Sequence, residues 1–393
     1  MSGITRVAGT EFLSAHTCRL EDFIEIVSER TDPADYPNAS SITDGVVVYD
    51  GNVIRGAFTH DGAAEPALLS EIAHALLHGP GIAVFTDAVD AAAIDAASSR
   101  FDEIIEAEKR SGQAAGDHFA KPGANDRVWN ALEKLALKDP ETFSSYYQSH
   151  VLAFACEAWL GPAYQVTSQV NVVNPGGEAQ QPHRDYHLGF MTDDEAERFP
   201  SHVQRLSPLL TLQGAVAHCD MPVETGPTMY LPHSQKYEAG YLAYRRPDFV
   251  DYFASHRVQL PLHKGDAIFF NPAVFHAAGH NRTQDVRRMA NLLQISSCMG
   301  RSLERVDRLE MSCALYPVLA DNLASGVPVD AVARVIAASA EGYPFPTSLD
   351  RDQPVDGLTP SSQADMMKQA LSEGWSAEKV REELTEQGRF RAS

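Results

Sequence analysis

The chain reads Gly265-Asp-Ala-Ile-Phe-Phe-Asn-Pro-Ala-Val-Phe-His276-Ala-Ala-Gly-His-Asn281-Arg-Thr-Gln-Asp-Val-Arg287 at the point that decides its fold. The apolar residues before His276 are typical of a β segment, and the Gly-His-Asn that follows indicates a turn into a second strand. Two antiparallel neighbours joined by such a turn bring the end of one strand close to the next strand. We therefore expect His276 and Arg287 to lie close together.

Arg287 is the arginine that we expect to face this histidine. By the period of two of a strand it shares one face with alternate residues up to Ile295, whereas Arg288 points to the other side, toward solvent. A guanidinium in this place is a fixed cation that can bind the distal carboxylate of a 2-oxoacid. The alternative for Arg287 is a surface ion pair.

A second histidine and a carboxylate occur upstream, in Gln180-Gln-Pro-His183-Arg-Asp185. They follow a strand and the turn Asn174-Pro-Gly-Gly, so both side chains can project from a strand end into a barrel mouth. With His276 they provide two imidazoles and one carboxylate, the facial triad that binds non-haem Fe(II) and leaves positions open for oxygen chemistry. We predict that His183, Asp185 and His276 are the metal ligands and catalytic residues.

Residues near the ligand pair are candidates for binding the organic reactants. The substrate candidates are Arg184, Tyr186 and His187. A polar helix or lid is expected beside them, over residues 192–200. Four polar residues of the inner strands are candidates for hydrogen bonds to a co-substrate, with Arg287 as its cation: Gln169, Asn171, Gln213 and Thr228.

His187 and His280 each stand four residues after a ligand histidine, a spacing that on a helix indicates a zinc site. Here the flanks favour strand and turn, and Pro182 with Gly189 disfavours a helix. We expect the two histidines to contact substrate or to hydrogen-bond the ligands, with plain surface positions as the alternative.

The composition is that of a globular chain in a reducing compartment. Apolar residues make up 44% and charged residues 22% of the 393 residues. The net charge of -21 disfavours nucleic acid and anionic lipid as partners. The five cysteines show no Cys-x-x-Cys spacing, and the N-terminus shows no apolar signal core. We expect a cytoplasmic protein with no membrane span, whose partner is a small-molecule substrate.

Three parts follow one another along the chain. Residues 1–66 are expected to form an extension packed on the core, with a hairpin over 46–55 that turns at Asp50-Gly51. Residues 67–300 form the main domain. Residues 301–393 form a helical extension, through which a homo-oligomer could assemble.

Within the main domain the predicted elements change character at Tyr164. Before it we expect helices over 67–79, 88–110 and 126–160 and a strand over 82–85. After it, short apolar and β-branched runs recur between turn residues, as a β-sandwich or barrel requires.

The chain resembles the phytanoyl-CoA dioxygenase family of Fe(II)- and 2-oxoglutarate-dependent oxygenases at these residues. The similarity covers roughly residues 67–300 and is most specific over Gly265–Arg287, where the family has a strand, a ligand histidine, an asparagine turn and the arginine that binds 2-oxoglutarate. His183-Arg-Asp185 fits the family's His-x-Asp, and Glu224–Pro232 is similar to its Asn-Gly-Pro-Thr strand. The chain departs from the pattern at Pro232-His-Ser-Gln235, where the family has Pro-Gly-Ser-His.

The resemblance implies a double-stranded β-helix, a cupin-like jelly-roll core flanked by helices, in a chain that is mainly β at its centre and α+β as a whole. It also implies a hydroxylase that uses Fe(II), 2-oxoglutarate and O2 on an unactivated C–H bond of a small molecule, releasing succinate and CO2. Related halogenases have a small residue where Asp185 stands, so the carboxylate favours hydroxylation over halogenation.

Two other functions are compatible with the same residues. A cupin-like metal enzyme that does not use 2-oxoglutarate would tolerate Arg287→Ala and release no succinate. A non-catalytic barrel that acts as a binding or assembly module would keep its role in a His276→Ala variant. We favour the oxygenase, because the triad and the arginine occur together in matching sequence contexts.

Overall fold

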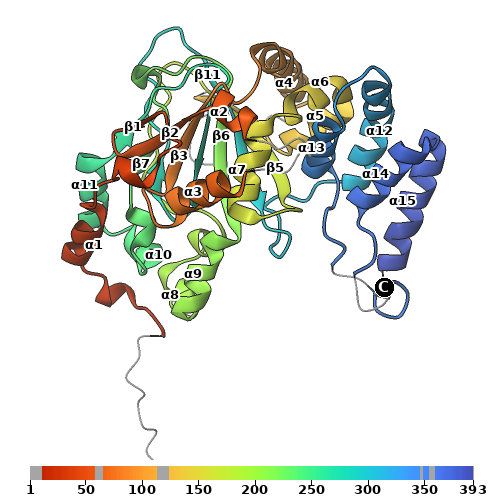
Figure 1. The fold of residues 1–393 in the computed structure, drawn as a ribbon. Helices are drawn as coiled ribbons and strands as arrows, with labels where there is room; N and C mark the ends of the chain where they lie inside the picture. The colour runs from red at the N-terminus through yellow and green to blue at the C-terminus, as the bar shows by residue number, and fades with distance from the viewer. Residues whose placement is uncertain (1–10, 58–64, 113–123, 346–347, 354–358, 393) are drawn as a thin grey trace, which may run out of the picture.

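The computed structural model describes residues 11–57, 65–112, 124–345, 348–353 and 359–392 (Figure 1). The first ten residues, where no signal core is predicted, lie outside this set. Among the described residues, one sheet has eight strands, in the order β1 (Ser41–Thr43), β2 (Val46–Asp50), β3 (Ile82–Thr86), β9 (Ala267–Phe270), β6 (Thr211–Ala217), β11 (Arg288–Ser296), β5 (Gln165–Val173) and β4 (Asn125–Val128). A smaller sheet has the order β10 (Phe275–Ala277), β7 (Met229–Leu231) and β8 (Val258–Gln259).

From β5 onward the chain alternates between these two sheets. β5, β6, β9 and β11 lie in the large sheet, and β7, β8 and β10 lie in the small one. The segment at His183 joins the small sheet through an antiparallel bridge to His276. Alternation of this kind wraps the chain into a jelly-roll barrel. The predicted α+β class with a double-stranded β-helix core is confirmed.

Helices cover the outer face of the large sheet (Figure 1). They are α3 (Pro66–Leu77), α4 (Ala91–Ser111), α5 (Ala131–Lys138), α6 (Pro140–Tyr147) and α7 (His150–Leu160). Their buried apolar side chains join Met289, Leu293 and Ile295 of β11 in one core. Because this face of the sheet is occupied by helices, only the opposite face is available to line a cavity.

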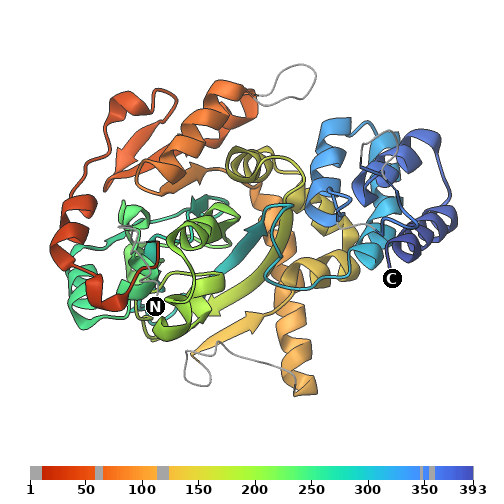
Figure 2. The same ribbon diagram turned by 90° about the horizontal axis from the view of Figure 1, so that it is seen from below.

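The C-terminal helices extend this helical layer away from the small sheet, as Figure 2 shows in a second view. They are α12 (Arg308–Ala324), α13 (Val329–Ser339), α14 (Gln363–Glu373) and α15 (Ala377–Arg391). At the other end α1 (Leu20–Val27), α10 (Gly240–Ala243) and α11 (Pro247–His256) pack on the small sheet, with Phe23 against Phe249 and Phe275. Within the described part of the chain, every helix is too short or too polar for a bilayer span.

The predicted hairpin over 46–55 is wrong. The turn lies six residues earlier, in the hairpin of β1 and β2, where Asp44 and Gly45 have φ angles of 49° and 78°. Such left-handed pairs are preferred in two-residue hairpin turns. Asp50 instead caps α2 (Gly51–Gly56), because its carboxylate accepts a hydrogen bond from the Asn52 N–H.

Most other predicted elements are confirmed, including the helix over 67–79 and the strand over 82–85, which are α3 and β3. The helix predicted from residue 126 starts instead with strand β4, because residues 125–128 pair with β5. The polar helix expected over 192–200 is α8 (Asp193–Ala196), which a capping box of Thr192 and Glu195 begins, and α9 (Ser201–Leu209) follows it.

The turn Pro232–Gln235 follows β7 of the small sheet, at a point where the chain departs from the family that it resembles. His233 stands where the family has glycine and adopts φ +66°. Ser234 is fully buried, and its hydroxyl donates to the Leu231 carbonyl at 2.6 Å and accepts from the Phe275 N–H at 2.8 Å. This hydroxyl therefore connects the end of β7 to the start of β10.

We expect Ser234→Ala to lower the free energy of unfolding by about 1–3 kcal/mol, because it leaves the buried Phe275 N–H without an acceptor. Urea unfolding would measure the change. The control is Ser255→Ala, since Ser255 is exposed and bonds only within its own helix; it should change stability by no more than about 0.5 kcal/mol. Equal stability of the two variants would contradict the assignment.

Candidate metal centre

The structure brings together the three residues that the sequence predicts as ligands. One potential ligand atom from each of His183, Asp185 and His276 lies within 4.8 Å of the others. His276 is the middle residue of β10, and its backbone exchanges two hydrogen bonds with His183, of 2.9 and 3.1 Å. The Asp185 N–H donates to the Pro272 carbonyl at 3.2 Å, which brings the carboxylate beside the two rings.

Backbone carbonyls orient both imidazoles. His183 Nδ1 lies 3.0 Å from the Gln181 carbonyl, and His276 Nδ1 lies 2.9 Å from the Val274 carbonyl. A carbonyl oxygen only accepts, so each Nδ1 carries the proton and each Nε2 is left with a lone pair. His183 Nε2 lies 3.8 Å from Asp185 Oδ1, and His276 Nε2 lies 3.4 Å from Oδ2.

The carboxylate of Asp185 is kept ionised. Burial alone would raise its pKa, but the positive charges that His183 and His276 carry when Nε2 is protonated, together with a hydrogen bond from Gln213, hold the pKa well below its ordinary value. Two Nε2 lone pairs and an ionised carboxylate that face one another are a suitable donor set for a divalent transition metal such as Fe(II). The three residues therefore fit the metal that the sequence implies.

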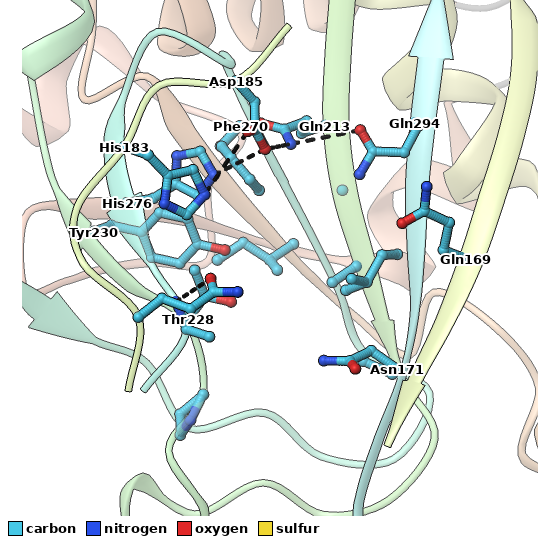
Figure 3. Close-up of a pocket in the computed structure, with 18 of the residues that line it drawn as sticks. Gln169, Asn171, His183, Asp185, Gln213, Thr228, Tyr230, Phe270, His276 and Gln294 are labelled. Carbon is cyan, nitrogen blue, oxygen red and sulfur yellow. Dashed lines mark hydrogen bonds and ion pairs between the residues drawn. The ribbon is translucent and has the colours of Figure 1, made fainter. Parts of the chain in front are cut away.

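A cavity of about 490 Å³ lies between the two sheets beside these residues. Figure 3 shows His183, Asp185 and His276 at one end and Gln169 and Asn171 projecting from the opposite wall. Much of the lining is apolar and comes from both sheets, including Leu260, Ile268 and Leu292. The three potential ligand residues thus face a partly enclosed cavity of the size that small ligands occupy.

The prediction that Arg287 faces this cavity is wrong. Its side chain is 49% exposed and pairs with Asp102 at 3.3 Å, which is the surface ion pair considered as the alternative. Arg288 is buried and lines the cavity. The period of two holds, but the apolar face of β11 that starts at Met289 packs on the outer helices, so the other face, from Arg288 to Gln294, lines the cavity.

Five of the remaining candidate residues line the cavity: Gln169, Asn171, Tyr186, Gln213 and Thr228. Arg184 does not, because its guanidinium is buried on the far side and donates to the carbonyls of Ser234 and Tyr237 at 2.6 and 3.0 Å. Gly240 provides the room for it, since a Cβ there would lie 1.9 Å from Arg184 Cζ. His187 is exposed and hydrogen-bonds Ser207, away from the lining. The substrate roles predicted for Arg184 and His187 are therefore corrected.

Several residues of the cavity were not predicted from the sequence: Arg127, Trp129, Tyr230, Arg288, Gln294 and Glu304. Arg127 and Trp129 lie on or beside β4, which was taken as helix, and Glu304 follows the last barrel strand. The strand register could have identified the residues of β11, because small and polar residues alternate with the apolar face that packs on the helices.

Known proteins resemble this chain in sequence and in fold. The family model described as phytanoyl-CoA dioxygenase matches residues 77–289. A curated relative, dioxygenase trt7 of Aspergillus terreus, is 31% identical over 153 residues, which are 38% of this chain and 48% of the relative. The matched part thus spans about half the length of that relative.

Two similar solved structures come from nogalamycin biosynthesis. The non-haem alpha-ketoglutarate-dependent epimerase SnoN is 20% identical with a TM-score of 0.40, and the match covers 59% of this chain and 82% of SnoN. The carbocyclase SnoK is 18% identical with a TM-score of 0.41, and the match covers 57% of this chain and 83% of SnoK.

His276→Ala should weaken binding of Co(II), a redox-stable probe of the cluster, by more than about 100-fold, since even residues outside the ligand set cost about 10- to 100-fold. Isothermal titration of the metal-free protein would measure the affinity. His280→Ala is the matched control, because His280 lies four residues later and is exposed. Unchanged affinity in His276→Ala would rule the cluster out as the binding site.

Proposed function

Because the chain belongs to the phytanoyl-CoA dioxygenase family, we propose that it is an Fe(II)- and 2-oxoglutarate-dependent dioxygenase that hydroxylates an unactivated C–H bond of a small molecule. The observation that carries the proposal is the convergence of His183, Asp185 and His276 on one cavity that also contains the buried cation of Arg288. The family supplies the class of reaction, and this geometry supplies a place for each reactant.

His183, Asp185 and His276 would hold the metal. Fe(II) bound there supplies the redox chemistry that couples O2-dependent decarboxylation of 2-oxoglutarate, giving succinate and CO2, to oxidation of the substrate. The two imidazoles and the carboxylate would leave coordination positions for the reactants, and the largely apolar lining would limit the access of bulk water to them.

Arg288 would bind the distal carboxylate of 2-oxoglutarate. Its guanidinium donates to the Thr225 carbonyl at 3.4 Å, and no described acidic side chain forms an ion pair with it. Burial lowers the pKa of Arg288 to about 10, so it is still a cation at neutral pH. A buried, unpaired cation is costly, and a carboxylate ligand offsets that cost.

Thr228 and Tyr230 stand beside this cation as further donors. Both line the cavity, and Figure 3 shows them on the same side as His276. The Tyr230 hydroxyl is buried, and the neighbouring Thr228 acts on it as a hydrogen-bond donor. Such a hydroxyl is free to donate to the same ligand carboxylate, which would fix 2-oxoglutarate between the metal cluster and Arg288.

The opposite wall, on β5 and β4, would hold the substrate. Asn171 Oδ1 and Glu304 Oε2 are buried acceptors without a partner among the described residues, and Trp129 provides an aromatic face. These groups suit a small molecule that donates hydrogen bonds. A CoA thioester is disfavoured, because the described lining of the 490 Å³ cavity has only Arg127 and Arg288 as permanent cations for its phosphates.

Anaerobic titration of the protein with Fe(II) and 2-oxoglutarate tests the proposal directly. We expect the weak visible charge-transfer band of the 2-oxoglutarate chelate, and slow succinate release when air is admitted. A folded protein that gives neither the band nor succinate would exclude the 2-oxoglutarate mechanism and favour a cupin-like metal enzyme.

The two adjacent arginines give a matched pair of variants. Arg288→Gln should raise the KM for 2-oxoglutarate by about 10- to 100-fold, the loss expected for one charge-assisted contact. Arg287→Gln should leave this KM within about twofold, because it removes only a surface ion pair. Succinate release at varied 2-oxoglutarate would measure both, and the reverse ranking would restore Arg287 as the binding residue.

A further inference from the structure

One row of side chains across the large sheet contacts two of the three ligand residues. Phe270 on β9, Gln213 on β6 and Gln294 on β11 are paired directly in the strand register. We call these three residues the ligand row. All three line the cavity at the end where His183, Asp185 and His276 lie.

Gln213 is the member of the ligand row that contacts Asp185. Its Nε2 donates a hydrogen bond to Asp185 Oδ2, and the same nitrogen lies 3.5 Å from Gln294 Oε1 (Figure 3). An ionised carboxylate only accepts, so the amide must present its nitrogen to Asp185. The orientation of the Gln213 amide is therefore determined by its two neighbours.

Gln213 is also held in place by its surroundings. Its side chain is 3% exposed, and it projects from the middle of a strand with paired strands on both sides. On the same row the ring of Phe270 packs edge-on against His276, with ring centroids 4.8 Å apart. The large sheet thus contacts Asp185 through Gln213 and His276 through Phe270.

Asp185 itself lies in irregular chain between β5 and α8, without strand partners of its own beyond one hydrogen bond to Pro272. Its side chain could rotate unless something outside this segment held it. Among the described residues, Gln213 is the residue on a strand of the large sheet that donates a hydrogen bond to the Asp185 carboxylate.

We propose that Gln213 is a positioning residue that fixes the carboxylate of Asp185 in its metal-binding orientation before the ion arrives. The inference rests on the metal site of the proposed function and goes beyond it, because it assigns that site's preorganisation to the ligand row. Outer hydrogen bonds to metal ligands orient them and raise metal affinity in this way.

Gln213→Met tests the inference, because methionine keeps nearly the same length and loses the donor. The probe is Co(II) alone, added to metal-free protein without 2-oxoglutarate or substrate. We expect the Kd for Co(II) to rise by about 10- to 100-fold. At saturation the visible spectrum of bound Co(II) should also change, because the carboxylate no longer has a fixed orientation.

Gln169→Met is the matched control. Gln169 is buried on the same face of the sheet and lines the same cavity, but it accepts a hydrogen bond from Arg127 and donates one to Glu304, neither of which is a candidate ligand. Its Kd and Co(II) spectrum should match those of the wild type within about twofold. Equal losses in both variants would overturn the proposal, because they would reflect cavity packing.

Further outcomes separate this inference from the proposed function. Wild-type affinity and spectrum in Gln213→Met would overturn the inference and leave the metal site intact, whereas a wild-type protein that binds no Co(II) would remove both. If thermal melting shows that Gln213→Met does not fold, Gln294→Met decides, since it removes the acceptor that orients the Gln213 amide. A wild-type Kd and spectrum in that variant would overturn the proposal.

Discussion

The site depends on the backbone pairing of His183 with His276. Two hydrogen bonds, of 2.9 and 3.1 Å, join residues that stand 93 positions apart (276 minus 183) and make them neighbours on the small sheet. Neighbouring strands lie about 4.8 Å apart, so side chains from two adjacent strands can reach one ion between them. The 4.4 Å separation of the two ring centroids follows from this pairing. Asp185, two residues along, then needs only a short irregular turn to complete the cluster.

The large sheet divides the molecule into a structural side and a chemical side. Alternate residues of each strand face opposite ways, so β11 contributes Met289, Leu293 and Ile295 to the helix-covered core and Arg288 and Gln294 to the cavity. The outer helices bury the apolar face and make the sheet stiff. The cavity face can therefore carry amides and a cation that would weaken an ordinary core.

The sequence was sufficient to predict the fold class and the clustering of His183, Asp185 and His276, because the resemblance to a known family implied the barrel and matched these three residues to its motif. It was not sufficient for Arg288, since both faces of β11 mix polar and apolar residues and the choice depends on which one the helices cover. The prediction placed the hairpin turn at Asp50-Gly51, where the turn signal is stronger, but the turn lies at Asp44-Gly45. Asp50 caps a helix instead. Arg184 was misassigned because proximity along the chain does not determine the direction of a side chain. Each error concerns tertiary packing that local patterns do not encode.

The burial of Arg184 has a kinetic consequence. It stands between two ligands, and its guanidinium is anchored to two carbonyls inside an aromatic pocket formed by Tyr241 and Phe275. Moving this loop outward would break the hydrogen bonds of the Arg184 guanidinium and take its charge through apolar surroundings. This step has a high barrier, because an unpaired charge is costly there. An ion bound at the proposed site would then exchange through the cavity that the reactants enter, so a ligand bound in that cavity would slow its loss.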